Sequence, residues 1–412
     1  MTERSITAVI VGAGHSGLAM SARLTARGVD HVIFERGEIA QSWRSERWDS
    51  LHLLTPNWQT GLPGYDYDGT DPDGYLSMPE VVSRISSYAQ IIDAPVRAHT
   101  AVTKVTPTDE GYRVETDDGV WQARHVIVAS GTARRPNLPA AAAAIPAEVR
   151  QITPLSYRNP DQLGAGGVLV VGASASGAQL ADEIARSGRR VVVSSGELVR
   201  MPRVYRGRDV FWWMDRAGVL DERYDEMDDI VRARHVPSPQ LVGSKARRDL
   251  DLGTLQELGV EIVGKLGMVR DGTALFSGGL ANVARLADLK EERLLDRFDE
   301  WAKEHGDITE APYRPDPVTV PARPRLSLDL VREGIETVVW ATGFAPDYSW
   351  LDVDTFDRKG RIVHDGGVGR AHGLYTLGTS LLRRRRSTYL SGAAADTEDL
   401  ARHLVSALAL AH

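Results

Sequence analysis

The chain has 412 residues, of which 42% are hydrophobic and 25% are charged, and its net charge is −7 at pH 7. This length predicts two or three domains, and the negative charge argues against binding to nucleic acid or to an anionic membrane surface. The absence of cysteine excludes disulfides, thiolate metal sites and thiol nucleophiles, and no run reaches the roughly 18 apolar residues of a membrane span.

The first predicted element is a strand over residues 6–11, β-branched and apolar as a buried parallel strand should be. Because no signal peptide precedes it, we expect a cytoplasmic protein. Gly12, Gly14 and Gly17 then open a helical pattern, and the next strand, "HVIFE", ends at Glu35. In such a unit the glycines let a pyrophosphate approach the positive end of the helix, and the acid binds an adenosine ribose. The unit is therefore predicted to hold a dinucleotide.

A long ordered loop rich in Trp, Pro, Gly and Asp is predicted over residues 40–79, and such loops are uncommon without a functional reason. The stretch "PEVVSRISSYAQ" predicts a helix. Residues 100–128 alternate between polar and apolar side chains, which predicts a meander of strands that ends in "HVIVASGT".

A second βαβ unit follows, and its turn reads "GASASG" from Gly172 to Gly177. Ser174 stands at the middle glycine position, where a small side chain still leaves room for a phosphate, and Ser176 precedes the last glycine. The second strand of this unit, "RRVVVSSGE", has Ser195 where the first unit has an acid. The repeat predicts a second dinucleotide site.

The choice between NADPH and NADH at this second site depends on the residues after its second strand. Loss of the carboxylate at Ser195 removes repulsion against a 2′-phosphate, and Arg200 and Arg203 lie close by in the sequence. These residues favour NADPH. Glu197 leaves NADH open, because its carboxylate could bind the ribose from two residues further along.

The remaining elements complete the predicted fold. Apolar residues between 280 and 301 predict one long helix, "IETVVWATGF" predicts a strand, and a final amphipathic helix is expected over 396–410. The expected fold class is α/β with two Rossmann-like dinucleotide-binding domains. Its FAD-binding domain is discontinuous, over 1–160 and 332–412. The NAD(P)H-binding domain, 161–331, is inserted between these parts and includes an irregular helical insertion at about 200–330.

Two glycine turns of this kind in one chain predict two bound dinucleotides. FAD would occupy the first and a nicotinamide cofactor the second, so that hydride passes from nicotinamide to flavin. The histidines show no metal-ligand spacing, so no metal site is predicted. His15 lies within the first phosphate turn, where its side chain can point to solvent, and it is assigned no chemistry.

Three further segments resemble the flavin-containing monooxygenases, in particular their bacterial and YUCCA-like branch. "SWR" at 42–44, followed by "WDSLHLLTP" at 48–56, is similar to the family's flavin-contacting loop. "WATGF" at 340–344 resembles the ATG motif that closes the nucleotide domain, and "GLYTLGTS" at 373–380 resembles the late strand of the flavin domain. The resemblance spans nearly the whole chain and is weakest from about 205 to 330.

The resemblance implies an oxidoreductase in which NADPH reduces FAD and the reduced flavin captures molecular oxygen as a C4a-(hydro)peroxide. One oxygen atom then passes to a small organic substrate at nitrogen, sulfur or an activated carbon. Asn57 is the expected polar group near the flavin's reacting edge, because an amide can hydrogen-bond both cofactor and peroxide. The alternative is that Asn57 only serves the turn "TPNW".

The same motifs and the resemblance give the remaining cofactor contacts, with Val102 expected to hold the adenine through its backbone. For FAD they are Gly12, Gly14, Ser16, Gly17, Glu35, Arg36, Trp43, Arg44, Asp49, Leu51, Thr55, Val102 and Gly378. For NADP they are Gly172, Ser174, Ser176, Gly177, Ser195, Arg200, Arg203, Ala341, Thr342 and Gly343.

One departure from the family bears on the reaction. The fingerprint FxGxxxHxxxY should precede the second glycine motif, but its first three positions hold Ala147, Val149 and Thr153, and only Tyr157 with the following Arg158 remains. The lost histidine leaves two alternatives open. One is an NAD(P)H oxidase or reductase that passes electrons to a partner, a quinone or oxygen, and the other is a non-catalytic flavin-binding scaffold. The disulfide reductases are excluded because they need a redox-active cysteine pair.

Two other stretches are noticeable for charge or aromatic content. "RRRR" at 383–386 is expected to be a solvated, salt-bridged run, and an anionic substrate, a cofactor phosphate or an acidic partner are its alternative uses. "RDVFWWM" at 208–214 is a core segment, a pocket wall or a contact in a homodimer.

Overall fold

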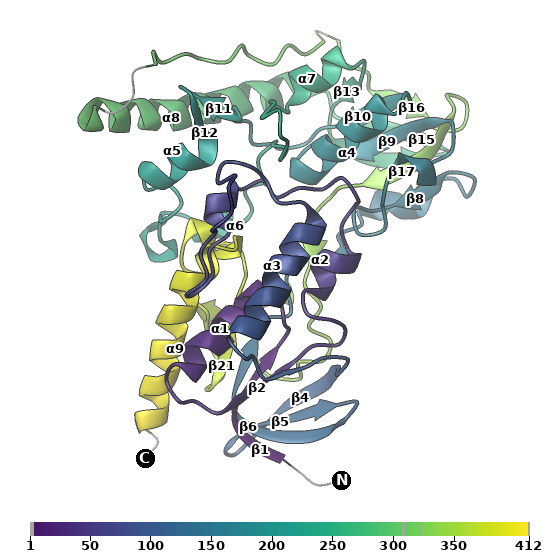
Figure 1. Ribbon diagram of the computed structural model, residues 1–412. Coiled ribbons are helices and arrows are strands. Elements are labelled where there is room, and N and C mark those ends of the chain that lie inside the picture. Colours follow the sequence, from purple (N-terminus) through teal and green to yellow (C-terminus); the bar gives the residue numbers. More distant parts are fainter. Residues whose placement is uncertain (1–3, 307–309, 322, 411–412) are drawn as a thin grey trace.

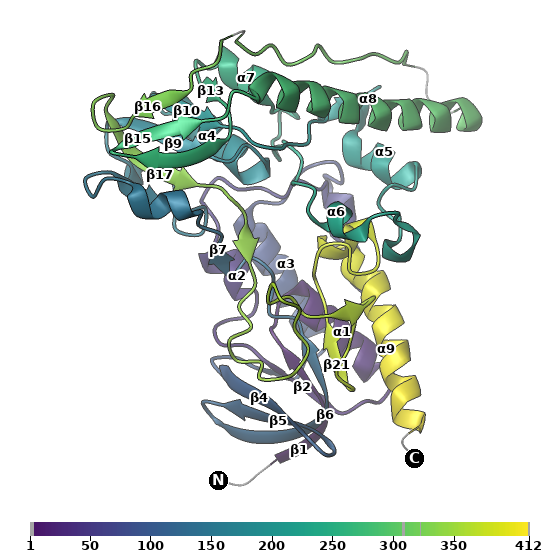
Figure 2. The same cartoon turned by 180° about the vertical axis from the view of Figure 1, so that it is seen from behind.

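The computed structural model describes residues 4–306, 310–321 and 323–410. Two sheets lie towards opposite ends of the molecule, each covered by helices, and the strands next to each glycine motif pair in parallel (Figures 1 and 2). This arrangement confirms the predicted α/β fold with two dinucleotide-binding units. Among the helices of the described residues, none has both the length and the apolar character needed to span a membrane.

The first sheet carries the first glycine motif. Its strands follow the order β19-β20-β21-β6-β1-β2-β3, with the β4–β5 hairpin attached to β6. β1 pairs in parallel with both β2 and β6, and the four apolar residues at its carboxyl end are buried. The bounds are β1 (Arg4–Val11), β2 (His31–Phe34), β3 (Val96–Arg97), β4 (Val102–Thr108), β5 (Gly111–Thr116), β6 (Gly119–Val128), β19 (His364–Asp365), β20 (Val368–Gly369) and β21 (Leu374–Thr376).

Helices from distant parts of the sequence pack around this sheet. They are α1 (His15–Thr25), α2 (Gln41–Ser45), α3 (Met78–Ile91) and α9 (Gly392–Leu410), with short 3₁₀ turns η1 (Asn57–Gln59) and η5 (Arg385–Thr388). α9 lies beside α1 in both views, and Arg23 of α1 forms an ion pair with Glu398 of α9 at 3.3 Å (Figures 1 and 2). The last helix therefore closes the same unit that the first strand begins.

The second sheet has the order β13-β10-β9-β17-β8 and carries the second glycine motif. α4 follows its central strand β9, as α1 follows β1. The bounds are β8 (Arg150–Ile152), β9 (Gly167–Val171), α4 (Ala175–Arg186), β10 (Val191–Ser194), α7 (Leu252–Glu257), β13 (Glu261–Val263) and β17 (Ile335–Trp340). A small antiparallel sheet adjoins it, formed by β14 (Leu266–Arg270), β15 (Thr273–Phe276) and β16 (Ser327–Asp329).

The structure moves two of the predicted domain boundaries. β8 and β17 both belong to the second sheet, although the sequence prediction places them in the FAD-binding segments. The physical reason is strand pairing, because β17 lies between β9 and β8 in parallel register. The chain crosses between the two units at β7 (Arg135–Pro136) and β18 (Phe344–Ala345), which pair antiparallel.

The insertion after β10 forms its own hydrophobic core. It contains β11 (Val204–Tyr205), β12 (Arg208–Asp209), α5 (Val210–Arg216), α6 (Ile230–Arg234) and α8 (Leu280–His305), the last of which matches the predicted long helix. Trp213 is fully buried, donates to the Tyr205 carbonyl at 2.6 Å and stacks on Phe298. "RDVFWWM" is therefore largely a core segment, with Trp212 half-buried at its edge. The remaining 3₁₀ turns are η2 (Ala140–Ala144), η3 (Pro160–Gln162) and η4 (Tyr224–Glu226).

Candidate cofactor sites

The first glycine turn is shaped by close backbone contacts. A Cβ at Gly12 would lie 2.5 Å from the Ala129 carbonyl oxygen, and a Cβ at Gly17 would lie 2.0 Å from the Gly12 carbonyl oxygen. A Cβ at Gly14 would meet nothing within 4 Å. Gly12 and Gly17 are thus required by packing, whereas Gly14 faces the open space that a phosphate would use.

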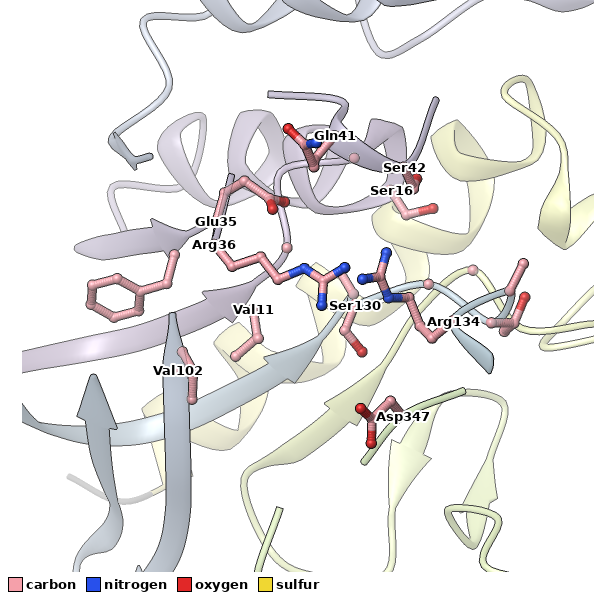
Figure 3. A pocket seen from close by; sticks show the side chains of 18 of the residues that line it. Val11, Ser16, Glu35, Arg36, Gln41, Ser42, Val102, Ser130, Arg134 and Asp347 are labelled. Atoms are coloured by element: carbon pink, nitrogen blue, oxygen red, sulfur yellow. The ribbon is translucent and has the colours of Figure 1, made fainter. Parts of the chain in front are cut away.

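Glu35 supports this turn from the end of β2. Its carboxylate accepts hydrogen bonds from the Ala13 N–H at 3.0 Å and from the Gly37 N–H at 3.1 Å. The side chain borders a cavity of about 580 Å³, and in Figure 3 it lies on one side of the opening. The carboxylate is therefore oriented by the backbone before any nucleotide binds.

The cavity brings together predicted FAD contacts from segments far apart in the sequence. Eight of them line it, namely Gly12, Gly14, Ser16, Glu35, Arg36, Trp43, Val102 and Gly378. The glycines, the free start of α1 and the acid at the end of β2 together fit an adenine dinucleotide with its pyrophosphate at the helix N-terminus. These residues would hold the ADP half of FAD.

Other lining residues were missed by the sequence analysis. One of them is Arg134, which extends towards the same central space as the predicted Arg36 in Figure 3; Arg134 and Arg36 form ion pairs with Glu46 at 2.7 Å and 3.2 Å. Asp347 lies on the side of this space opposite Glu35. Their sequence neighbourhoods carry no spacing signal, because the cavity walls come from loops that meet only in the folded chain. Further lining residues of this kind are Arg47, Ser130, Ser349, Trp350 and Thr388.

His15 also lines the cavity, in contrast to its predicted solvent-facing place. Burial lowers the pKa of its imidazole from 6.5 to about 4, so the ring is neutral near pH 7. The ring contacts Trp43 edge-on, with centroids 6.2 Å apart. The sequence signal for this placement was the position of His15 inside the glycine motif, because that turn faces the expected phosphate.

Five predicted FAD contacts are not among the residues that line this cavity, namely Gly17, whose place is set by packing, and Arg44, Asp49, Leu51 and Thr55. Asp49 is exposed and accepts a hydrogen bond from the Asn159 amide at 2.7 Å. Leu51 is buried in the main hydrophobic core, and Thr55 is also buried. Their assignment as flavin contacts stays a prediction.

Asn57, the predicted catalytic residue, is buried in η1 and also lies outside the cavity. Its amide nitrogen donates to the Asp71 carbonyl at 2.8 Å, which suits the alternative of a turn residue. Its Oδ1 has no hydrogen-bond partner among the described residues, and neither amide atom of the neighbouring buried Gln59 has one. A role for Asn57 in catalysis stays a prediction.

The second glycine turn repeats the contacts of the first. A Cβ at Gly172 would lie 2.3 Å from the Ala341 carbonyl oxygen, and one at Gly177 would lie 1.9 Å from the Gly172 carbonyl oxygen. Ala341 takes the place that Ala129 has in the first unit. The predicted group Ala341, Thr342 and Gly343 therefore follows β17 next to this turn, and Ser174 and Ser176 lie half-buried at the start of α4.

A neighbouring segment of the insertion touches the second turn. The Ser238 carbonyl accepts from the Ala175 N–H at 3.3 Å, and the buried Gln240 amide donates to the Ala173 carbonyl at 2.6 Å. The bond between the Ala175 N–H and the Ser238 carbonyl is long, so this N–H could donate to a phosphate oxygen instead. The turn thus fits a second dinucleotide, whose pyrophosphate would replace the Ser238 contact.

The prediction that Arg200 and Arg203 bind a 2′-phosphate needs correction, because carboxylates inside the protein already engage both. Arg200 is buried and bonds Asp251 and Asp288, each at 2.8 Å. Arg203 is fully buried and bonds both oxygens of Asp209, at 2.7 and 2.8 Å. Their guanidinium groups therefore form ion pairs within the protein that hold its segments together.

A family model described as pyridine nucleotide-disulphide oxidoreductase matches residues 9–204. An uncharacterized CzcO-like oxidoreductase of Geobacillus kaustophilus is 28% identical over 399 residues, which cover 96% of this chain and 97% of that protein. The indole-3-pyruvate monooxygenase YUCCA1 of Oryza sativa is 32% identical over 187 residues, covering 44% of this chain and 46% of that protein. A flavin-containing monooxygenase structure from Stenotrophomonas maltophilia has a TM-score of 0.68 and 20% identity, covering 98% of this chain and 99% of that one.

The chain is similar in fold to flavin-containing monooxygenases, and its first half matches a family of pyridine nucleotide-dependent oxidoreductases. It is an oxidoreductase. The chain has no cysteine and therefore lacks the thiols that a disulfide reductase would use.

Tyr157 and Arg158, which remain from the FxGxxxHxxxY pattern, have a structural role in this chain. Arg158 donates to the Arg47 carbonyl at 3.1 Å and to the Ser45 carbonyl, and its own carbonyl accepts from the Asp49 N–H at 2.8 Å. It therefore fixes the loop that carries Trp43 and Arg47 into the first cavity. Tyr157 is fully buried, and burial raises the pKa of its hydroxyl.

The arginine run is salt-bridged, as expected, but it is not a free surface. Arg384 bonds Asp396 and Asp399 of α9, at 2.9 and 3.0 Å. Arg385 bonds Glu222 of the insertion at 2.5 Å. Arg386 bonds Asp215 and Asp221 there, both at 2.7 Å. The run thus joins the insertion to the last helix of the first unit.

Proposed function

We propose that the protein is an FAD-dependent, NADPH-using monooxygenase that transfers one oxygen atom from molecular oxygen to a small organic substrate at nitrogen, sulfur or an activated carbon. The observation that carries the proposal is the pair of equivalent glycine turns on two linked sheets, of which only the first turn has an acid at the end of the following strand. One turn would hold FAD and the other the nicotinamide cofactor that reduces it.

The chain's own residues would bind, orient and shield. Gly12, Gly14 and Gly17 admit the pyrophosphate of FAD to the start of α1, and Glu35 accepts hydrogen bonds from its ribose. Trp43 and the neutral His15 form an uncharged wall, which would limit access of water. When bound, the reduced flavin supplies the electrons that activate oxygen.

The alternative is an NAD(P)H oxidase or reductase, and the altered fingerprint favours it. Where the family carries its histidine, this chain has Thr153, whose N–H and hydroxyl are engaged with Ser156 in a local turn. Thr153 therefore does not supply the imidazole that the family pattern has at this position. Product analysis therefore has to separate oxygen transfer from release of hydrogen peroxide.

The experiment uses the FAD-loaded protein, NADPH and isotopically labelled oxygen gas with a panel of amines, sulfides and ketones. Label in an organic product, with less peroxide released than NADPH consumed, supports the monooxygenase. Peroxide equal to the NADPH consumed across the whole panel points to the oxidase, and reduction of a quinone or protein acceptor points to the reductase. If neither NADPH nor NADH reduces the flavin in the absence of oxygen, the monooxygenase, the oxidase and the reductase are all contradicted. The non-catalytic flavin-binding scaffold would then remain.

Light-driven reduction of the same preparation provides the matched control. If flavin reduced by light releases peroxide quantitatively, whereas flavin reduced by NADPH gives labelled product, then retained NADP⁺ is needed for oxygen transfer. Equal yields by both routes would show that shielding depends on the protein walls alone.

A further inference from the structure

The ends of the second strands in the two units are structurally equivalent. The Glu35 N–H donates to the Arg97 carbonyl at 3.0 Å, and the Ser195 N–H donates to the Val263 carbonyl at 2.9 Å. Likewise, Gly12 and Gly172 donate to the last residue of the neighbouring second strand at 2.8 and 2.9 Å. Ser195 therefore occupies the place of Glu35, next to the expected adenosine ribose.

Ser195 itself offers little to that ribose. It is fully buried, and its hydroxyl is oriented towards the Gly196 carbonyl at 3.3 Å. Recognition of the nucleotide at this point must therefore come from side chains that surround the strand end. With Arg200 and Arg203 committed to internal carboxylates, those side chains are to be found on other elements.

Two lysines from different elements reach this strand end. Lys290 of α8 has its ammonium 2.7 Å from the Glu197 carboxylate, two residues beyond Ser195. Lys265, between β13 and β14, packs its stem beside Gly196, where an added Cβ would lie 3.7 Å from its Cγ and Cδ. The position that carries an acid in the FAD unit is thus bordered by the stem of Lys265, and the ammonium of Lys290 pairs with the carboxylate two residues beyond it.

We infer that Lys290, assisted by Lys265, binds the 2′-phosphate of NADPH, and that Glu197 is the resting counter-ion that the phosphate displaces. The Glu197 side chain is 62% exposed and that of Lys290 is 35% exposed, so their ion pair is weak in water. A 2′-phosphate carries more charge than a carboxylate and has three acceptor oxygens, so it competes well for the ammonium. The inference rests on the proposed nicotinamide site and names the residues that set its cofactor preference.

The test uses two probes on the FAD-loaded protein, 2′,5′-ADP and 5′-AMP, because they differ only in the 2′-phosphate. We expect Lys290→Met to weaken 2′,5′-ADP binding about tenfold while 5′-AMP changes less than about twofold. Lys265→Met should act in the same direction with a smaller effect. Glu197→Gln should tighten 2′,5′-ADP several-fold and raise the NADPH to NADH ratio of flavin reduction rates.

Lys303→Met is the matched control, because Lys303 is an exposed lysine in the last turn of the same helix and should leave both affinities unchanged. Isothermal titration calorimetry gives the affinities, and circular dichroism checks that each variant is folded. The inference is overturned if Lys290→Met leaves the preference for 2′,5′-ADP intact, or if the wild type prefers 5′-AMP. Absence of binding of either probe, together with no flavin reduction by NADPH or NADH, would instead overturn the proposed function.

Discussion

The guanidinium of Arg203 donates to the Leu54 carbonyl at 2.8 Å and thereby links the insertion to the segment that precedes Thr55 and Asn57. The same group bonds both oxygens of Asp209, which also accepts from the Tyr75 hydroxyl. Tyr75 and Leu54 both belong to the long loop of the first unit. A buried charge therefore sets the position of this loop relative to the insertion.

Arg203→Met should destabilise the protein strongly. Removing one partner of a buried ion pair leaves an uncompensated carboxylate at Asp209, and such changes cost about 3–5 kcal/mol. Urea unfolding followed by circular dichroism measures the loss. Arg332→Met, at an exposed position, is the control and should change the free energy of unfolding by less than about 0.5 kcal/mol. A similar small change for Arg203→Met would show that the pair is dispensable.

Gly14→Ala should separate folding from FAD binding. The residue has φ −82° and open space around its Cβ position, so alanine fits the backbone and stability should change by less than about 1 kcal/mol. The methyl group would occupy the approach of the pyrophosphate, and FAD affinity should fall at least about tenfold. Fluorescence titration of the apoprotein measures the affinity. Gly17→Ala is the contrast, because its Cβ would collide with the Gly12 carbonyl and should impair folding itself.

Glu35→Gln should weaken FAD binding without unfolding the protein. The amide oxygen can still accept the Ala13 N–H, but the charge that strengthens hydrogen bonds to the ribose is lost, at a cost of about 1–2 kcal/mol in binding free energy. Glu38→Gln, three residues further along and exposed, should leave the affinity unchanged. Equal FAD dissociation constants for the wild type and Glu35→Gln would contradict the assigned role.

His125 predicts a loss of stability in acid. Burial, reinforced by the charge of His372, lowers its pKa from 6.5 to about 4. Between these two pH values the unfolded chain binds a proton that the folded protein does not, so stability falls as the pH falls from about 6.5 to about 4 and then levels off. The contribution is at most about 3 kcal/mol. Urea unfolding at a series of pH values should show a shallower decline for His125→Gln than for the wild type.

The exposed His99 supplies the control for this measurement. It lies within 2.9 Å of the Glu38 carboxylate on the surface, and His99→Gln should keep the acid slope of the wild type. If both substitutions leave the slope unchanged, the acid sensitivity belongs to other groups. His15 and His364, whose pKa values burial also lowers to about 4, would be the next to replace.

Local sequence determined the two glycine turns. Gly12 and Gly17, like Gly172 and Gly177, must be glycine because backbone atoms of the same unit occupy the space of a side chain. Glu35 and Ser195 follow from the same short-range frame, since the second strand begins a fixed distance after the turn. Motifs of this kind can be read in order along the chain, and the parallel strand pair of each βαβ unit follows from them.

Only the tertiary structure decided the partners of the charged residues and the walls of the first cavity. Arg200, Arg203 and the arginine run are cations next to a predicted site in the sequence, but folding brings carboxylates from α8, α9 and the insertion against them. Lys290 lies far along the chain from Glu197 and meets it only because α8 packs back on the second unit. Ion pairs form between side chains close in space, and no spacing along the sequence records that distance.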